Sequence, residues 1–184
     1  TEMKKYIVGL SMVLLSLGLV GCGSTNNEGS SDSTGKAATS STAKEETLEV
    51  NDSNGKVTVP KNPKKVVVFD NGSLDTLDAL GVGDKVVGAA TDNLPAYLDD
   101  YKKVDSAGGI KEPDLEKINQ MKPDLIIISG RQSDFLEQLK EIAPTMYLAV
   151  DTSDTWNSIK QNVETLGKIF GKEKAAEKQL VALE

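Results

Sequence analysis

Short, unbroken runs of branched apolar residues alternate with amphipathic segments from residue 66 onward. A strand that is buried on both faces needs such a run, and helical crossovers between these strands imply parallel pairing. The pattern predicts four strands, at 66–69, 86–89, 125–128 and 146–149. We therefore expect an α/β fold, a three-layer, Rossmann-like lobe in which helices cover both faces of a parallel sheet.

Apolar residues at helical spacing predict four helices around these strands, over 74–80, 115–121, 135–142 and 156–169. Ser73 and Asp114 are the expected N-caps of the first two helices, and Pro144 and Gly171 are the expected stops of the last two. Trp156 belongs to the apolar stripe of the fourth helix. This position favours a place in the core over a role as a ligand platform.

Two further segments flank this alternation. The runs 47–50 and 56–59 alternate in polarity on either side of a turn that ends in Asn54-Gly55, which predicts an edge hairpin. A last helical pattern, at 175–183, follows Gly171. Because no later segment of this sequence is left to cover it, we expect its apolar stripe to lack a packing partner.

Composition excludes several classes of function. The net charge of −7 argues against nucleic acid as a partner, because phosphate binding needs clustered positive charge. The chain has no histidine and one cysteine, so it offers neither an internal disulfide nor a soft transition-metal site. Gly81 and Gly83 follow a helix rather than a strand, which rules out a dinucleotide loop. Asp99-Asp100 is more simply read as a solvated segment than as an acid–base pair. Binding is therefore favoured over enzymatic chemistry.

Polar loops follow the predicted strands, at 70–73, 91–93, 129–132 and 151–153, with Gly108-Gly109 in a further connection. Ligands of open parallel sheets bind in the loops beyond the carboxyl ends of strands. Arg131 is the only arginine beside 20 lysines, and its planar guanidinium suits planar anions. The alternative is a surface arginine paired with a carboxylate. Arg131 is the first candidate ligand residue, and Asn71, Asn93 and Gly109 follow from their loops.

The first 45 residues differ from the rest. Lys4-Lys5 and the apolar run 6–20 have the basic start and short apolar core of a secretory signal. Gly21-Cys22 behind them resembles a bacterial lipoprotein signal, which implies a diacylglycerol on Cys22; a buried cysteine after a membrane helix is the alternative. From Gly23 to Lys44 the chain has almost no bulky apolar side chain, so we expect a flexible tether.

The folded region resembles the amino-terminal half of the iron–siderophore-binding lipoproteins that feed ABC importers. Four stretches carry the resemblance, at 66–70, 91–98, 111–118 and 122–128. Ser129-Gly130-Arg131-Gln132 is more specific and is similar to members that bind ferric catecholates such as petrobactin. The resemblance implies that Arg131 faces the anionic iron complex, and that Glu116 pairs with arginines of an ABC permease. An ordinary first-turn glutamate, favoured by the helix dipole, is the alternative for Glu116.

The resemblance implies a two-lobed, periplasmic-binding-protein-like fold joined by one long helix. On this reading the signal peptide is 1–21, the tether 22–45, the amino-terminal lobe 46–171, and 172–184 begins a truncated inter-lobe helix. The protein would be lipid-anchored on the outer face of a cell membrane, as in Gram-positive bacteria. We expect this chain alone to bind a ferric siderophore weakly. Binding of haem or cobalamin, or a surface interaction module without a small ligand, are the alternatives.

Overall fold

The computed structural model describes residues 45–184. The expectations for the signal peptide, for Cys22 and for the tether lie outside these residues. The strands are β1 (Thr47–Asp52), β2 (Gly55–Pro60), β3 (Val66–Val68), β4 (Val86–Ala89), β5 (Asp105–Ser106), β6 (Leu125–Ile128) and β7 (Thr145–Tyr147). The helices are α1 (Asn71–Ala79), α2 (Leu115–Met121), α3 (Leu136–Ile142), α4 (Thr155–Ile169) and α5 (Glu173–Leu183). Short 3-10 segments are η1 (Gly83–Lys85), η2 (Thr91–Asn93), η3 (Ala96–Lys103) and η4 (Gly130–Phe135).

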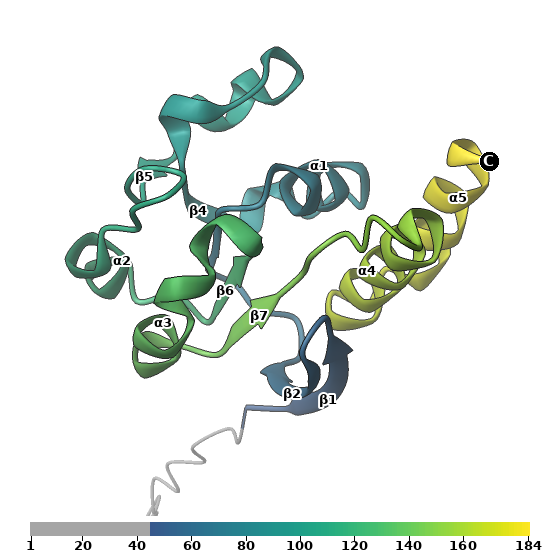
Figure 1. The fold of residues 1–184 in the computed structure, drawn as a ribbon, viewed down its shortest axis with the longest axis horizontal. Helices are drawn as coiled ribbons and strands as arrows, with labels where there is room; N and C mark the ends of the chain where they lie inside the picture. The colour runs from purple at the N-terminus through teal and green to yellow at the C-terminus, as the bar shows by residue number, and fades with distance from the viewer. Residues whose placement is uncertain (1–44) are drawn as a thin grey trace, which may run out of the picture. The chain divides into compact units, whose positions relative to one another are not determined.

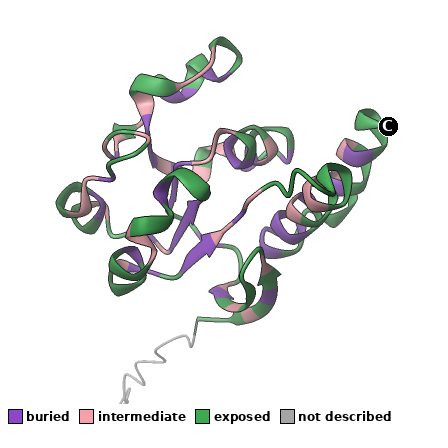
Figure 2. Ribbon diagram, viewed as in Figure 1, coloured by how far each residue is buried: buried purple, intermediate pink, exposed green. Residues whose placement is uncertain are grey.

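Five strands form one parallel sheet in the order β5-β4-β3-β6-β7 (Figure 1). Alternate residues of the central strands point to opposite faces, as the pleat requires. Val66, Val68 and Ile127 pack with α1, α4 and the hairpin, whereas Val67 and Ile126 pack with α2 and α3. Figure 2 shows the central strands as buried and the helices as exposed on their outer sides. The predicted three-layer α/β fold is confirmed.

Some local expectations were wrong. The N-cap of α1 is Asp70, whose carboxylate accepts the backbone N–H of Ser73 at 2.8 Å, and Ser73 itself lies inside the helix. Trp156 is 37% exposed in the first turn of α4 and is not in the core. The stripe of α5 does have a partner: Ala176 and Leu180 are buried in the core beside α4. Helices α4 and α5 can approach closely because Gly167 has no side chain, and an added Cβ would lie 2.7 Å from the Cβ of Ala176.

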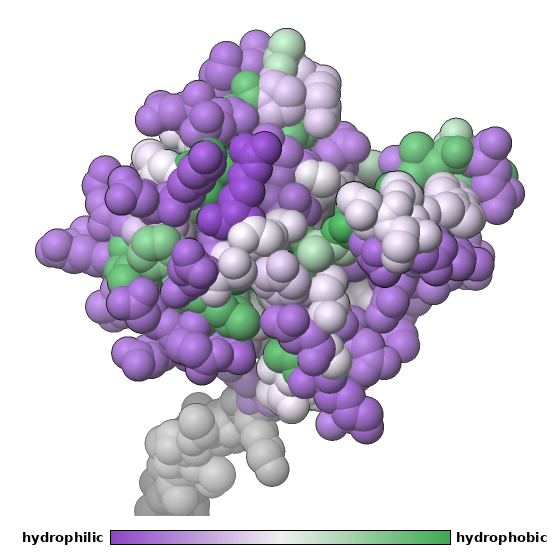
Figure 3. Space-filling view, viewed as in Figure 1, coloured by the Kyte–Doolittle hydropathy of each residue, from purple (hydrophilic) through white to green (hydrophobic). Residues whose placement is uncertain are grey.

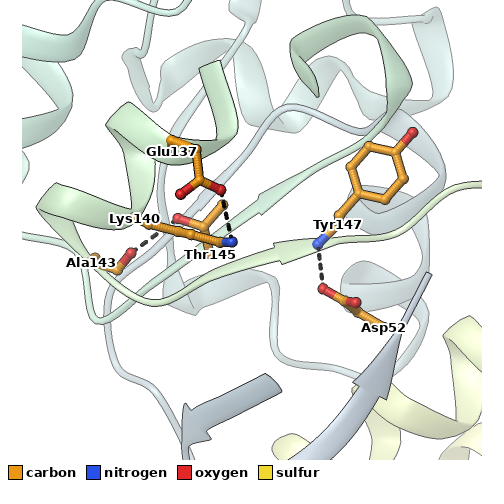
Figure 4. A network of polar contacts seen from close by, with 6 residues as sticks. All are labelled: Asp52, Glu137, Lys140, Ala143, Thr145 and Tyr147. Atoms are coloured by element: carbon orange, nitrogen blue, oxygen red, sulfur yellow. Dashed lines mark hydrogen bonds and ion pairs between the residues drawn. The ribbon is translucent and has the colours of Figure 1, made fainter. Parts of the chain in front are cut away.

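The hairpin β1–β2 forms a two-stranded sheet of its own and adds no strand to the edge of the larger sheet. Its turn nevertheless covers the outer edge of β7. The backbone N–H of Tyr147 donates to the Asp52 carboxylate at 3.0 Å (Figure 4). The Ser53 N–H donates to the Tyr147 carbonyl at 2.9 Å. These bonds satisfy backbone groups that an edge strand would otherwise leave free for pairing with another chain.

Candidate functional site

The order of the strands creates a switch point between β3 and β6. The chain passes from β3 outward through β4 to β5, then returns to the other side of β3 for β6 and β7. Successive connections therefore leave in opposite directions at the carboxyl ends of β3 and β6, which opens a crevice there. The two strands are in register, since the N–H of Phe69 donates to the carbonyl of Ile127 at 2.9 Å. Asp70 and Asn71 thus face Ser129 and Gly130 across this crevice.

A pocket of about 210 Å³ occupies the switch point, and it is called the switch-point pocket below. Its lining residues are Asp70, Asn71, Ile110, Ser129, Arg131 and Gln132. Three connections contribute to it: the one after β3, the turn at 108–113 that follows β5, and η4 after β6. Loops from distant parts of the chain therefore converge on one small polar cavity.

Arg131 supplies the positive charge of this pocket. Its side chain is exposed, and none of the ion pairs within residues 45–184 includes it. The carboxylate pairing that the alternative predicts is therefore absent among these residues. An arginine whose donors have no carboxylate partner can direct them to a bound anion, and guanidinium donors suit planar, delocalised anions.

The other predicted ligand residues differ in how they are connected to the pocket. Asn71 lines it, and its side-chain amide donates to the backbone carbonyl of Asn93 at 3.3 Å. Asn93 is thus linked to the site through Asn71 without lining the pocket. Gly109 precedes Ile110, and its N–H donates to the carbonyl of Glu112 at 3.0 Å, so that donor is used within the turn. The structure brings Arg131 and Asn71 together and places Asn93 and Gly109 beside them.

The turn at 108–113 depends on a glycine. Gly108 has a φ of +108°, a conformation that residues with a side chain rarely adopt, and an added Cβ would lie 2.4 Å from the backbone N of Asp114. The turn is closed by the reciprocal backbone bonds of Gly109 and Glu112 and by the bond from the Asp114 N–H to the Ala107 carbonyl. This tight turn carries Ile110 to the pocket wall.

The pocket is also lined by four residues that are not among the predicted ligand residues: Asp70, Ile110, Ser129 and Gln132. Gln132 is 1% exposed, and its side-chain oxygen accepts the N–H of Ser129 at 3.0 Å. The sequence does contain a signal for this contact, because Ser129-x-x-Gln132 is the spacing of a capping box. Ile110 has no comparable signal, since its place depends on how the turn after β5 folds back.

Glu116 lies away from the pocket, in the first turn of α2 behind the N-cap Asp114. Its side chain is exposed and forms no ion pair within the described part of the chain. This placement agrees with both the docking hypothesis and the helix-dipole alternative.

A larger cavity of about 410 Å³ lies between the hairpin, α4 and α5. Its charged lining consists of Glu49, Lys56, Glu164, Lys168, Glu173 and Glu177. Glutamates outnumber lysines there, and Lys56 is already paired with Glu49 at 2.9 Å. No loop from the carboxyl end of a sheet strand reaches this cavity, so the switch-point pocket is the better candidate for an anionic ligand.

Residues 45–184 contain no group of side chains arranged to hold a metal ion. Within the same residues no helix has the length and hydropathy that a membrane crossing requires. An open α/β lobe with a pocket at its switch point has the arrangement in which sheets of this kind bind ligands. The model of the periplasmic binding protein family matches residues 66–184, and the chain belongs to this family.

Relatives within this family extend the comparison. The chain is 43% identical to the petrobactin-binding protein YclQ of Bacillus subtilis, over 99% of this chain and 56% of YclQ. It is 38% identical to the putative ABC transporter substrate-binding lipoprotein YhfQ of the same organism, over 99% of this chain and 54% of YhfQ. The chain therefore spans about half the length of these relatives.

Solved structures agree with the sequence relatives. The crystal structure of YclQ superposes with a TM-score of 0.73 at 48% identity, covering 75% of this chain and 50% of YclQ. The catecholate-siderophore-binding protein VctP of Vibrio cholerae superposes with a TM-score of 0.70 at 38% identity, with the same coverage of 75% and 50%. Both structures match the α/β architecture described above.

Proposed function

We propose that this chain is the amino-terminal lobe of a solute-binding lipoprotein that delivers a ferric siderophore of the catecholate type to an ABC permease. The observation that carries the proposal is Arg131, which lies in the switch-point pocket without a carboxylate partner among residues 45–184. A ferric tris-catecholate carries excess negative charge on planar rings. A guanidinium can neutralise this charge and stack on the rings at the same time.

The relatives support the nature of the ligand. YclQ is named for binding petrobactin and VctP for binding catecholate siderophores. Since this chain spans about half of YclQ, a second lobe would contribute the other wall of the site. The isolated lobe should therefore bind more weakly than a protein that holds the ligand from both sides.

The anchor and the permease contact belong to the same proposal. Residues 1–21 would act as a signal peptide, Cys22 would carry the lipid, and residues 22–45 would tether the lobe to the outer face of the membrane. Two acyl chains on one cysteine give stable anchoring. The lobe would comprise residues 46–171, and residues 172–184 would begin the helix that leads to the second lobe. Glu116, exposed on α2, would contact the permease.

The test is a titration with ferric petrobactin, in which binding is measured by equilibrium dialysis and by the absorbance of the iron complex. Two proteins are compared: this chain, and the chain joined at Glu184 to the carboxyl-terminal half of YclQ. We expect weak binding by the chain and tighter binding by the joined protein. Ferric hydroxamate, haem and cobalamin serve as competing ligands. Preference for haem or cobalamin would contradict the catecholate reading, and no binding of any ligand would favour a surface interaction module.

Arg131→Ala should weaken binding of ferric petrobactin. A hydrogen bond to a charged group contributes about 1.5–3 kcal/mol, which corresponds to roughly 10- to 150-fold in Kd. Arg131→Lys should fall in between, because it keeps the charge and loses the planar fork. Lys103→Ala is the matched control, since it removes the same charge from an exposed position outside the pocket. Equal losses in Arg131→Ala and Lys103→Ala would show that net charge alone explains the effect.

A further inference from the structure

Gln132 joins two of the three connections that form the switch-point pocket. Its side-chain oxygen accepts the N–H of Ser129, directly after β6, at 3.0 Å. Its side-chain nitrogen donates to the carbonyl of Ile110, at the tip of the turn that follows β5. Ile110, Ser129 and Gln132 all line the pocket. One buried side chain thus connects segments that are 22 residues apart in sequence.

The amide of Gln132 satisfies both partners without a change in protonation. Ser129 offers a donor and Ile110 an acceptor, so the side chain between them must present one acceptor and one donor. A carboxylate could accept from Ser129 but would place a second lone pair against the Ile110 carbonyl. An apolar side chain would leave both backbone groups without partners in a place where the side chain is 1% exposed.

The neighbouring arginine does not share this role. The side chain of Arg131 is exposed and that of Gln132 is buried, so successive residues of η4 point to different surroundings. Gln132 holds the backbone from which Arg131 extends and, through Ile110, a second part of the pocket lining. The remaining bonds of the 108–113 turn are internal or lead to its base at Ser106 and Ala107. Gln132 alone ties its tip to η4 among the hydrogen bonds of residues 45–184.

We infer that Gln132 is a positioning residue for the proposed ligand site: it holds the 108–113 turn against η4 so that the pocket is formed before a ligand arrives. The expected effect on ligand affinity rests on the proposed function, whereas the expected effect on the 108–113 turn does not. Preorganisation raises affinity because the free protein spends less time in states that cannot bind. If loss of the bridge leaves the turn in place about one tenth of the time, the Kd rises about tenfold.

The first measurement is amide hydrogen exchange by the chain without any ligand. In Gln132→Met, the amides of Gly109 and Glu112 should exchange faster than in the unaltered chain, because both lie in the turn that loses its anchor. Amides of α4 should keep their rates. Gln138→Met is the matched control, since it makes the same change at an exposed position on α3. Unchanged exchange at Gly109 and Glu112 in Gln132→Met would overturn the inference.

A second variant covers the case in which Gln132→Met fails to fold. In Gln132→Glu, a protonated carboxyl can donate to Ile110 and accept from Ser129, whereas the carboxylate cannot donate. Position 132 is buried, and burial raises the pKa of a carboxyl above its ordinary value of about 4.3. The turn of Gln132→Glu should therefore exchange only slightly faster than that of the unaltered chain at pH 5, and much faster at pH 8. A structural defect without the bridge would give the same excess at both values of pH, and that result would contradict the inference.

The binding arm uses ferric petrobactin and the chain. The Kd should rise about tenfold in Gln132→Met and stay the same in Gln138→Met. If the unaltered chain binds and Gln132→Met binds equally well, the positioning role is wrong while the proposed function stands. If the unaltered chain binds no siderophore, the proposed function fails, and the exchange measurement still decides whether Gln132 holds the turn.

Discussion

Asp70 stabilises α1 and also adds negative charge to a pocket proposed to bind an anion, and two substitutions separate these effects. Its carboxylate accepts the N–H of Ser73 at 2.8 Å and the Ser73 hydroxyl at 2.6 Å. Asp70→Ala removes the cap and should cost about 1–2 kcal/mol of folding free energy. Asp70→Asn keeps a capping oxygen, so it should stay within about 0.5 kcal/mol of the unaltered chain.

The two variants should differ in stability and also in ligand affinity. In a domain of this size about 1–2 kcal/mol lowers the melting temperature by roughly 3–8 °C, which circular dichroism can resolve. Asp70→Asn also removes a negative charge from the pocket wall. A like charge at contact distance costs about 1 kcal/mol in water, so Asn should tighten binding of ferric petrobactin about fivefold.

The control for the electrostatic part is Asp75→Asn, which removes the same charge from an exposed position on the same helix. It should leave both the melting temperature and the affinity nearly unchanged. The reasoning would be refuted if Asp70→Asn destabilised the fold as much as Asp70→Ala. The charge argument would be refuted if Asp70→Asn weakened binding, or if Asp75→Asn tightened it equally.

Two further predictions concern the rest of the lobe. Burial, together with the 2.7 Å hydrogen bond that the Tyr101 hydroxyl donates to Asp78, raises the pKa of Tyr101. The folding stability that this raised pKa provides is complete below the ordinary pKa of 10.0 and is lost as pH rises above it. In urea unfolding, the free energy of unfolding of Tyr101→Phe should therefore fall less at alkaline pH than that of the unaltered chain. An equal decline would contradict this cause. Glu116→Arg should reduce siderophore uptake by cells that carry the complete protein and its permease, and it should leave ligand affinity unchanged. Glu137→Arg on α3 is the control. Unimpaired uptake in Glu116→Arg would rule out the docking role.

The sheet was predictable because its strands are buried on both faces. Runs such as 86–89 and 125–128 have no polar interruption, and the structure places strands at these residues. The two-residue strand β5 was not predicted, since Asp105-Ser106 has no apolar run and pairs only through backbone bonds to β4. Trp156 was misplaced because its spacing fits the apolar stripe, whereas the first turn of α4 extends beyond the core.

Only those pocket residues whose place is set by the end of a predicted strand could be predicted from the sequence. Asn71 and Arg131 each lie three residues beyond the ends of β3 and β6, so the switch-point rule brings them together. Ile110 follows an unpredicted strand, and its approach depends on the turn at Gly108 and on the side chain of Gln132. Exposed apolar residues did not help to locate the pocket. Figure 3 shows mostly hydrophilic residues on the visible face, with apolar residues in small separate patches.

The measurement that tests the central claim most directly is a ¹H–¹⁵N NMR titration of the chain with the gallium(III) complex of petrobactin. Gallium(III) has the charge of iron(III) without its paramagnetism, and NMR detects weak binding residue by residue. The account predicts that shifted amides cluster at 70–73, 108–111 and 129–132, and that Arg131→Ala removes most of the shifts. Shifts confined to the cavity between the hairpin, α4 and α5, or no shifts at saturating complex, would contradict a siderophore site at the switch point.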